Sequence, residues 1–181
     1  GKLVPQYGGG ICQIGTTFFN TVFFSGLPVV ERKNHSFYIS HYPLGRDATV
    51  TWNGPNLRWK NDTSSWILIR VSYTNSSVTV SLYGTDPGYD VAYTTSAWSG
   101  MRAHPVKEIK DPTLPVGARV VEDGGVDGGN ITVVRTVTKA GAVVRTDTFV
   151  SKYNPKEETV RVGTKPVSPP ATTTPIPTPA P

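Results

Sequence analysis

The 181-residue sequence contains very few sulfur-bearing residues, with one cysteine, Cys12, and one methionine. A single cysteine excludes an intrachain disulfide framework and any zinc site built from several thiolates. No apolar run approaches the roughly 20 residues that a membrane-spanning helix needs, and no secretory signal peptide is recognisable. Because the chain begins at Gly1 and not at methionine, we interpret it as a fragment, so the absence of a targeting signal says little about location.

Runs of charge are also missing. The 18 basic and 13 acidic residues give a formal net charge of +5, but Arg32–Lys33 is the only adjacent basic pair. Proteins that bind nucleic acid cluster their basic residues on one face or in one run, so we expect no nucleic-acid partner. The mild basic excess is compatible with anionic wall polymers or lipid headgroups, and equally with an ordinary soluble protein.

One helix is predicted over residues 11–25 by an apolar stripe at three-to-four-residue spacing. The stripe consists of Ile11, Ile14, Phe18, Val22 and Phe23. Gly26 is well placed to cap the end of this helix, and Pro28 cannot continue it.

The pattern then changes to segments rich in β-branched and aromatic residues, which predict strands. These segments are 37–42, 48–52, 66–73 and 77–83, with a short strand near 57–60. We therefore expect an α+β fold in which one helix packs on a mainly antiparallel sheet. This first domain would cover residues 1–84.

The rest of the chain divides by composition. Glycine and proline interrupt residues 85–115, which we interpret as an extended connector, although 89–95 has strand character. Residues 116–165 predict a small, elongated, all-β module, because large apolar groups are scarce there. Its strands are expected at 117–122, 131–138, 142–151 and 158–163, with a hairpin turn at residues 139–141. The Pro/Thr-rich tail, 166–181, favours disordered polyproline II.

Cys12 is the strongest candidate for chemistry. It follows three glycines at the start of the predicted helix, where free backbone N–H groups and the helix dipole stabilise a thiolate. A nucleophilic cysteine also needs a base and an orienting group. His35 and His41 are candidate bases and Asp47 a candidate orienting acid, in a chain order found in several thiol hydrolases and transferases.

Structural roles for the same residues remain open. Cysteine is among the most buried residue types and often fills space under a sheet. Arg46 and Asp47 are equally compatible with a structural ion pair or a turn-capping contact. We expect no cofactor and no metal.

Residues 1–83 resemble the VanW-like family. The matching pieces are Gly8-Gly9-Gly10-Ile11-Cys12-Gln13, a Thr-rich helix, a Gly-Leu…Glu-Arg…His-Ser stretch and Gly45-Arg46-Asp47-Ala48-Thr49-Val50. The resemblance matches Cys12, Gln13, His35, Ser36, Gly45 and Asp47 to the family pattern. It implies an exported or envelope protein of a family associated with vancomycin resistance, and it implies no mechanism.

Residues 116–165 resemble the five-glycine (G-five, G5) domain. The matching pieces are Pro115-Val116-Gly117, the loop 124–129, Gly141, Ser151-x-Tyr153-x-Pro155 and Val162-Gly163-Thr164. That family occurs in wall-associated enzymes and adhesins, and binding of N-acetylglucosamine has been proposed for it. The few aromatic residues here also allow a purely structural spacer.

Three functions follow from the sequence. The first is an extracytoplasmic cell-envelope protein, at the cell wall or cell surface, whose β module binds or spaces along peptidoglycan. The second is a thiol-dependent envelope enzyme, hydrolase or transferase, with Cys12 as the nucleophile. The third is a passive stalk for surface adhesion.

Overall fold

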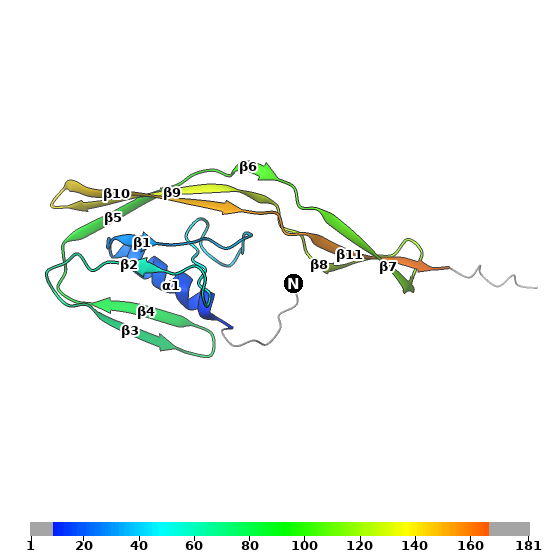
Figure 1. The fold of residues 1–181 in the computed structure, drawn as a ribbon, viewed down its shortest axis with the longest axis horizontal. Helices are drawn as coiled ribbons and strands as arrows, with labels where there is room; N and C mark the ends of the chain where they lie inside the picture. Colours follow the sequence, from blue (N-terminus) through cyan, green and yellow to red (C-terminus); the bar gives the residue numbers. More distant parts are fainter. Residues whose placement is uncertain (1–8, 167–181) are drawn as a thin grey trace, which may run out of the picture.

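The computed structural model describes residues 9–166 and contains one helix and eleven strands within that range (Figure 1). The predicted tail, 166–181, lies almost entirely outside the described residues. The elements are α1 (Ile11–Phe24), β1 (Val29–Glu31), β2 (Arg58–Trp59), β3 (Leu68–Tyr73), β4 (Val78–Tyr83), β5 (Tyr89–Thr95), β6 (Ser99–Arg102), β7 (Val106–Pro115), β8 (Arg119–Asp123), β9 (Gly128–Lys139), β10 (Ala142–Tyr153) and β11 (Glu158–Lys165).

The helix lies between two layers of strands. In Figure 1 the β3–β4 hairpin runs along one side of α1, and β5, β9 and β10 run along the other. A separate three-stranded sheet, in the order β7–β11–β8, extends away from this compact part. All strand pairs are antiparallel except β7 with β11, so the α+β class with mainly antiparallel pairing is confirmed.

The main core joins residues that are far apart in the sequence. Phe19 and Phe23 of α1 are fully buried against Ile131 and Val133 of β9 and against Tyr153 of β10. Every second residue of β9 faces the helix, as the two-residue period of a strand requires. The helix and the long β9–β10 hairpin therefore bury each other's apolar faces.

The buried face of α1 differs from the predicted stripe. Ile11 and Ile14 are 46% and 44% exposed, whereas Gly15, Thr16 and Phe19 are buried. The stripe was predicted from apolar residues alone. In the structure the small residues Gly15 and Thr16 are buried in place of Ile11 and Ile14, because they allow the helix to pack closely.

Two predicted strands, 37–42 and 48–52, are wrong. Their backbone groups bond to side chains and to loops instead of to a ladder: Ala48 N–H donates to the hydroxyl of Thr16, and Thr49 N–H donates to Lys33 O. Turns also interrupt the first segment, with Tyr42 N–H bonded to Ile39 O. Both segments are irregular, and both border the candidate site.

The second half of the chain is more regular than its composition indicated. The stretch 85–115, interpreted as a connector, contains β5, β6 and β7. The predicted hairpin turn is confirmed, because Ala140 and Gly141 both have positive φ, as a tight two-residue turn between right-twisted strands requires. β9 and β10 each have twelve residues and extend over α1.

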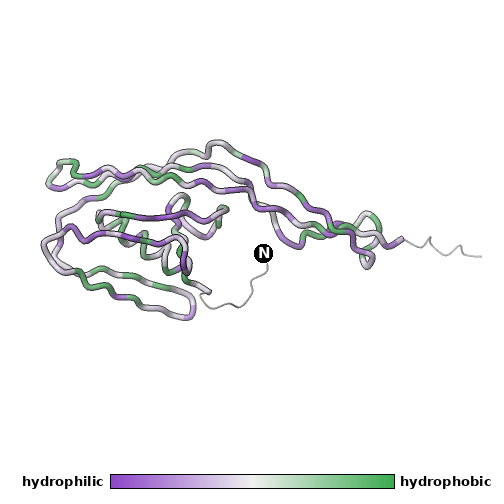
Figure 2. The backbone as a smooth tube through the Cα atoms, in the orientation of Figure 1, coloured by the Kyte–Doolittle hydropathy of each residue, from purple (hydrophilic) through white to green (hydrophobic). Residues whose placement is uncertain are grey.

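Hydropathy is uneven over the surface. Figure 2 shows apolar stretches along the β3–β4 hairpin as well as along α1. All six residues of β3 are exposed, including Leu68, Val71 and Tyr73. This hairpin therefore buries only the face that β4 turns toward α1.

Candidate functional site

The first turn of α1 places Cys12 against the irregular segment 48–50. The helix comes close to this segment because Gly15 has no side chain: a Cβ there would lie 3.3 Å from Val50 Cγ2. One turn earlier, Cys12 Sγ lies 3.5 Å from Thr49 Oγ1 and 3.6 Å from Val50 O. Cys12 is half-buried and has no disulfide partner.

His35 is fixed by Asp47. Both the main-chain N–H and the Nδ1 of His35 lie 2.7 Å from Asp47 Oδ2. The two segments are adjacent because Thr49 N–H donates to Lys33 O at 2.8 Å. The imidazole also stacks on the Tyr42 ring, with 5.1 Å between ring centroids. Because a carboxylate can only accept, Nδ1 is the protonated ring nitrogen, and Nε2 is the ring nitrogen that Asp47 does not hold.

The second oxygen of Asp47 is held from elsewhere in the chain. The hydroxyl of Tyr153 donates to Asp47 Oδ1 at 2.6 Å, and Arg32 Nη2 donates to the same atom at 3.0 Å. Arg32 in turn donates to Ser151 Oγ at 2.9 Å. The Asp47 side chain is only 4% exposed, so these donors take the place of water.

The surroundings shift the pKa values of Cys12 and His35 toward each other. Burial by itself raises the pKa of Cys12, but hydrogen bonds at Thr49 and Val50 and the interaction with His35 outweigh it, so the pKa is lowered. Burial acts to lower the pKa of His35, yet its bonds to Asp47 and Cys12 raise it. Thiol and imidazole therefore shift in the directions that a nucleophile and its base require.

Asp47 remains charged in this setting. Burial raises the pKa of a carboxyl, but the bonds from His35 and Tyr153 and the charge of Arg32 bring the pKa of Asp47 below its ordinary value. Burial and the nearby Asp47 charge raise the pKa of Tyr153, which therefore stays a hydrogen-bond donor.

The structure brings together Cys12, His35 and Asp47, the three catalytic candidates of the sequence. The alternative base, His41, is exposed, and its ring lies tilted against Tyr42 with 4.2 Å between ring centroids. Asp47 pairs with Arg32, and Arg46 packs on aromatic rings instead. The pairing of Arg46 with Asp47 considered from the sequence is therefore not the one that forms.

The other residues that match the VanW-like pattern lie around these three candidates. Gln13 is exposed beside Cys12, and Gly45 O accepts a hydrogen bond from Arg32 at 3.1 Å. Ser36 O accepts from Asn154 N–H at 2.6 Å. Sequence reasoning did not identify Arg32 or Tyr153 as site residues. Tyr153 is one of only two aromatic residues in the predicted β module, and that scarcity was the available signal.

An open groove lies near Cys12 and His35, although none of the three candidates is among its lining residues. The α1 face, the loop 41–43 and β4 line it. Tyr42, which stacks on His35, is part of its wall, as is Gln13, the residue after Cys12. The lining residues are Gln13, Thr16, Thr17, Asn20, Thr21, Phe24, Ser25, His41, Tyr42, Pro43, Ser81 and Leu82. Most of these residues carry a hydroxyl or amide group, Phe24, Pro43 and Leu82 add apolar surface, and no Asp, Glu, Lys or Arg is among them.

Two further findings concern the described residues only. Between residues 9 and 166, no three His, Cys, Asp or Glu side chains are grouped so that they could hold a metal ion. Within the same range, α1 is neither long nor apolar enough to cross a membrane.

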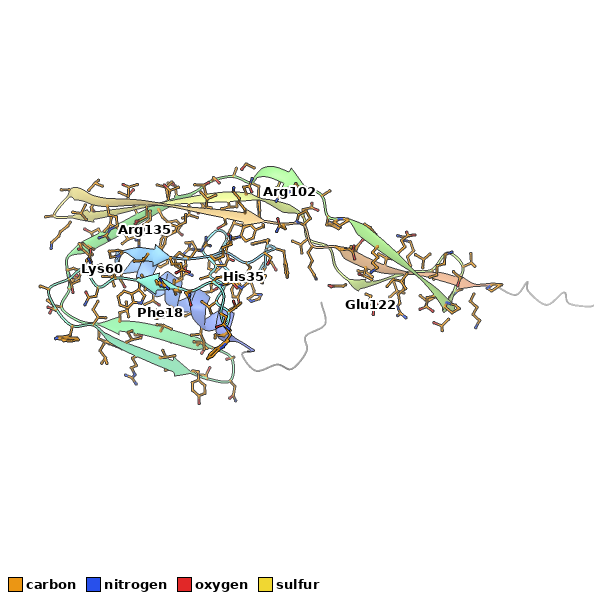
Figure 3. The ribbon with its side chains drawn as sticks, in the orientation of Figure 1. Phe18, His35, Lys60, Arg102, Glu122 and Arg135 are labelled. Carbon is orange, nitrogen blue, oxygen red and sulfur yellow. The ribbon has the colours of Figure 1, made fainter. Side chains whose placement is uncertain are left out.

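Figure 3 shows His35 within the compact part of the molecule, while Glu122 lies in the extension formed by β7, β8 and β11.

Two family models match this chain. The one described as VanW like protein matches residues 1–83, and the one described as G5 domain matches residues 102–165. The chain has a VanW-like region followed by a G5 domain. The G5 match begins at residue 102, whereas the sequence predicted this module from residue 116. Tyr153 and Ser151 belong to the G5 domain, and the three catalytic candidates belong to the VanW-like region.

Individual relatives cover parts of the chain. The uncharacterized protein YoaR of Bacillus subtilis (strain 168) is 43% identical over 86 residues, which are 48% of this chain and 28% of that protein. A solved structure of an IgA1 protease G5 domain is 20% identical and covers 42% of this chain and 93% of its own, with a TM-score of 0.27. Proteins with VanW-like and G5 domains are typically extracytoplasmic, which indicates a cell-envelope protein.

Proposed function

We propose that this protein is a thiol-dependent hydrolase or transferase of the cell envelope, with Cys12 as nucleophile, His35 as base and Asp47 as the orienting acid. The 2.7 Å contact between Asp47 Oδ2 and His35 Nδ1, next to a thiol of lowered pKa, carries the proposal. A structural cysteine needs neither an adjacent imidazole nor a buried carboxylate. Cys12 has an imidazole beside it, and a buried carboxylate holds that imidazole.

The arrangement suits acyl transfer. His35 takes the thiol proton, and Cys12 Sγ attacks the carbonyl carbon of an acyl substrate to form a C–S bond. The leaving group then departs with the proton from His35, leaving a thioester. Water or an acceptor amine attacks this thioester, loses its proton to His35 and releases Cys12. The positive end of the α1 dipole supports both the thiolate and the developing oxyanion.

The groove beside the site is where we place the substrate. It mixes hydroxyl and amide groups with apolar side chains and contains no Asp, Glu, Lys or Arg, which fits an uncharged chain better than a strongly charged one. Tyr42 connects the groove to the catalytic pair, because the same ring lines the groove and stacks on His35. A chain lying along α1 would reach Cys12 at the first turn of the helix.

Alkylation of Cys12 tests this proposal and requires no substrate. The rate of reaction with iodoacetamide is measured between pH 4 and 10 for the whole chain, in which Cys12 is the only thiol. We expect reactivity well below the ordinary thiol pKa of about 8.5. His35→Ala is expected to return the profile to that of an ordinary thiol. An ordinary profile in the unmodified protein contradicts the proposal.

His41→Ala is the matched control. It removes the same side chain six residues further along, at an exposed position where the ring lies against Tyr42. It should leave the profile unchanged. Incubation with purified sacculi, followed by mass spectrometry of the released fragments, then searches for a product that disappears with Cys12→Ser.

A second proposed function concerns the G5 domain, which we propose binds or spaces along peptidoglycan. The G5 match and the extended β7–β11–β8 sheet support this role. Retention of the whole chain on sacculi should saturate, and N-acetylglucosamine oligomers should compete, whereas cellulose oligomers, which lack the N-acetyl group, should not. Cys12→Ser should bind as the unmodified protein does. Retention that does not saturate favours a passive stalk instead.

A further inference from the structure

The end of β10 contacts the segments that carry His35 and Asp47 through four consecutive residues. Two of these contacts use the main chain: Asn34 Nδ2 donates to Lys152 O at 2.8 Å, and Asn154 N–H donates to Ser36 O at 2.6 Å. The other two use side chains, namely those of Ser151 and Tyr153, described above. Residues 151–154 thus hold both sides of the candidate site.

Tyr153 has the most direct contact of the four. Its side chain is 1% exposed, and its hydroxyl lies 2.6 Å from Asp47 Oδ1. Because Tyr153 and Arg32 occupy Oδ1, the carboxyl group cannot rotate freely, and Oδ2 is kept facing His35 Nδ1. Orientation of this kind, one step removed from the reacting atoms, is a recognised means of tuning a catalytic or metal-bound histidine.

We propose that Tyr153 is a positioning residue of the Cys12–His35 site, so that the G5 domain supplies part of the catalytic machinery of the VanW-like region. This inference rests on the proposed thiol-dependent function. Tyr153 touches no reacting atom and acts through Asp47 on His35. Ser151 supports this arrangement, because its hydroxyl accepts a hydrogen bond from Arg32 Nη1 while Arg32 Nη2 donates to Asp47.

The test compares the pH profile of Cys12 alkylation in the whole chain with that of Tyr153→Phe. The variant keeps the ring in the core and removes only the hydroxyl. We expect the profile to move toward that of an ordinary thiol, with a rate near pH 6 reduced about tenfold, because a hydrogen bond to a charged group is lost. A purely structural tyrosine would leave this profile in place.

Tyr38→Phe is the matched control. Tyr38 packs edge-to-face on Tyr153, with 5.7 Å between ring centroids, and belongs to the same aromatic cluster. Removal of its hydroxyl should not alter the profile. A shift of equal size in both variants would overturn the positioning role and indicate a general loosening of the cluster.

The outcomes separate the two proposals. A lowered thiol pKa in the unmodified protein, combined with an identical profile in Tyr153→Phe, refutes the role of Tyr153 and leaves the thiol-dependent function standing. An ordinary thiol profile in the unmodified protein refutes both. If Tyr153→Phe does not fold, Ser151→Ala decides, with a smaller shift expected in the same direction and no shift counting against the proposal.

Discussion

The guanidinium of Arg135 donates to the main-chain carbonyl of Phe23 at 2.8 Å, and this bond joins β9 to the carboxyl end of α1. The same side chain reaches Leu27 O at 2.9 Å and pairs with Asp147 Oδ2 at 2.6 Å. Carbonyls at a helix end lack partners within the helix and carry partial negative charge. Arg135 is fully buried, and main-chain carbonyls and a carboxylate accept from its guanidinium in place of water. Figure 3 shows its place in the compact part of the molecule.

Arg135→Met should destabilise the protein strongly. It keeps much of the buried volume but removes the charged donor that Phe23 O, Leu27 O and Asp147 share. We expect the free energy of unfolding to fall by about 3–5 kcal/mol. Urea unfolding followed by circular dichroism measures the change. Arg119→Met is the control, because the pair of Arg119 with Glu108 is more than half exposed and should contribute under about 1 kcal/mol.

Phe19→Ala should be similarly damaging for a different reason. Phe19 is fully buried and packs edge-to-face on Phe149 of β10, with 5.5 Å between ring centroids. The substitution leaves a cavity between the helix and the sheet and should cost about 3–5 kcal/mol in thermal or urea unfolding. Phe24→Ala, at a position that is 49% exposed, should cost clearly less.

Gly45→Ala tests the turn that leads into Asp47. Gly45 has φ of +70°, and a Cβ there would lie 2.7 Å from Ile131 Cγ2 and 2.8 Å from Val133 Cγ2. We expect backbone strain of about 1 kcal/mol plus about 1–3 kcal/mol of overpacking. Gly88→Ala is a close match, with the same φ and no atom near the new Cβ. It should show the backbone cost alone, and equal losses would refute the steric explanation.

The stability of the protein should depend on Asp47 in acid. Burial opposes ionisation of Asp47, but its hydrogen bonds and Arg32 lower its folded-state pKa below the unfolded value of about 3.9. Its contribution is therefore complete above about pH 5, well above the unfolded pKa, and is lost as the pH falls through the folded pKa. Asp47→Asn should flatten this part of the curve and lower the free energy of unfolding at neutral pH by about 1.5–3 kcal/mol. Chemical unfolding at pH 2 to 7 measures both effects. If the free energy of unfolding falls with decreasing pH equally in the variant and in the unmodified protein, other carboxyl groups cause the loss of stability in acid.

Local patterns were sufficient to predict much of the fold. The helix at α1, the β3–β4 hairpin and the turn at Ala140–Gly141 depend on neighbours in the sequence, and their signals are in the residues themselves. The segments 37–42 and 48–52 have strand-like composition, but side chains from α1 and adjacent loops take up their backbone groups. Such tertiary competition has no local signal.

The candidate site divides in the same way. Cys12, His35 and Asp47 stand out by residue type and order, and all three lie within 36 residues of one another in the sequence. Tyr153 is separated from Asp47 by 106 residues and looks like an ordinary strand aromatic. Arg32 looked like half of a surface basic pair. Their roles follow from the packing of β10 beside α1, which no periodicity in either segment indicates.

The shared core has a practical consequence for dissecting this protein. Cutting the chain between the two family matches would remove Ile131 and Val133 from above Phe19 and Phe23. The amino-terminal piece would expose an aromatic patch of the kind that drives aggregation. It would also separate Asp47 from the hydroxyl of Tyr153. A boundary that is clear between two sequence families thus runs through the middle of a single packed interior.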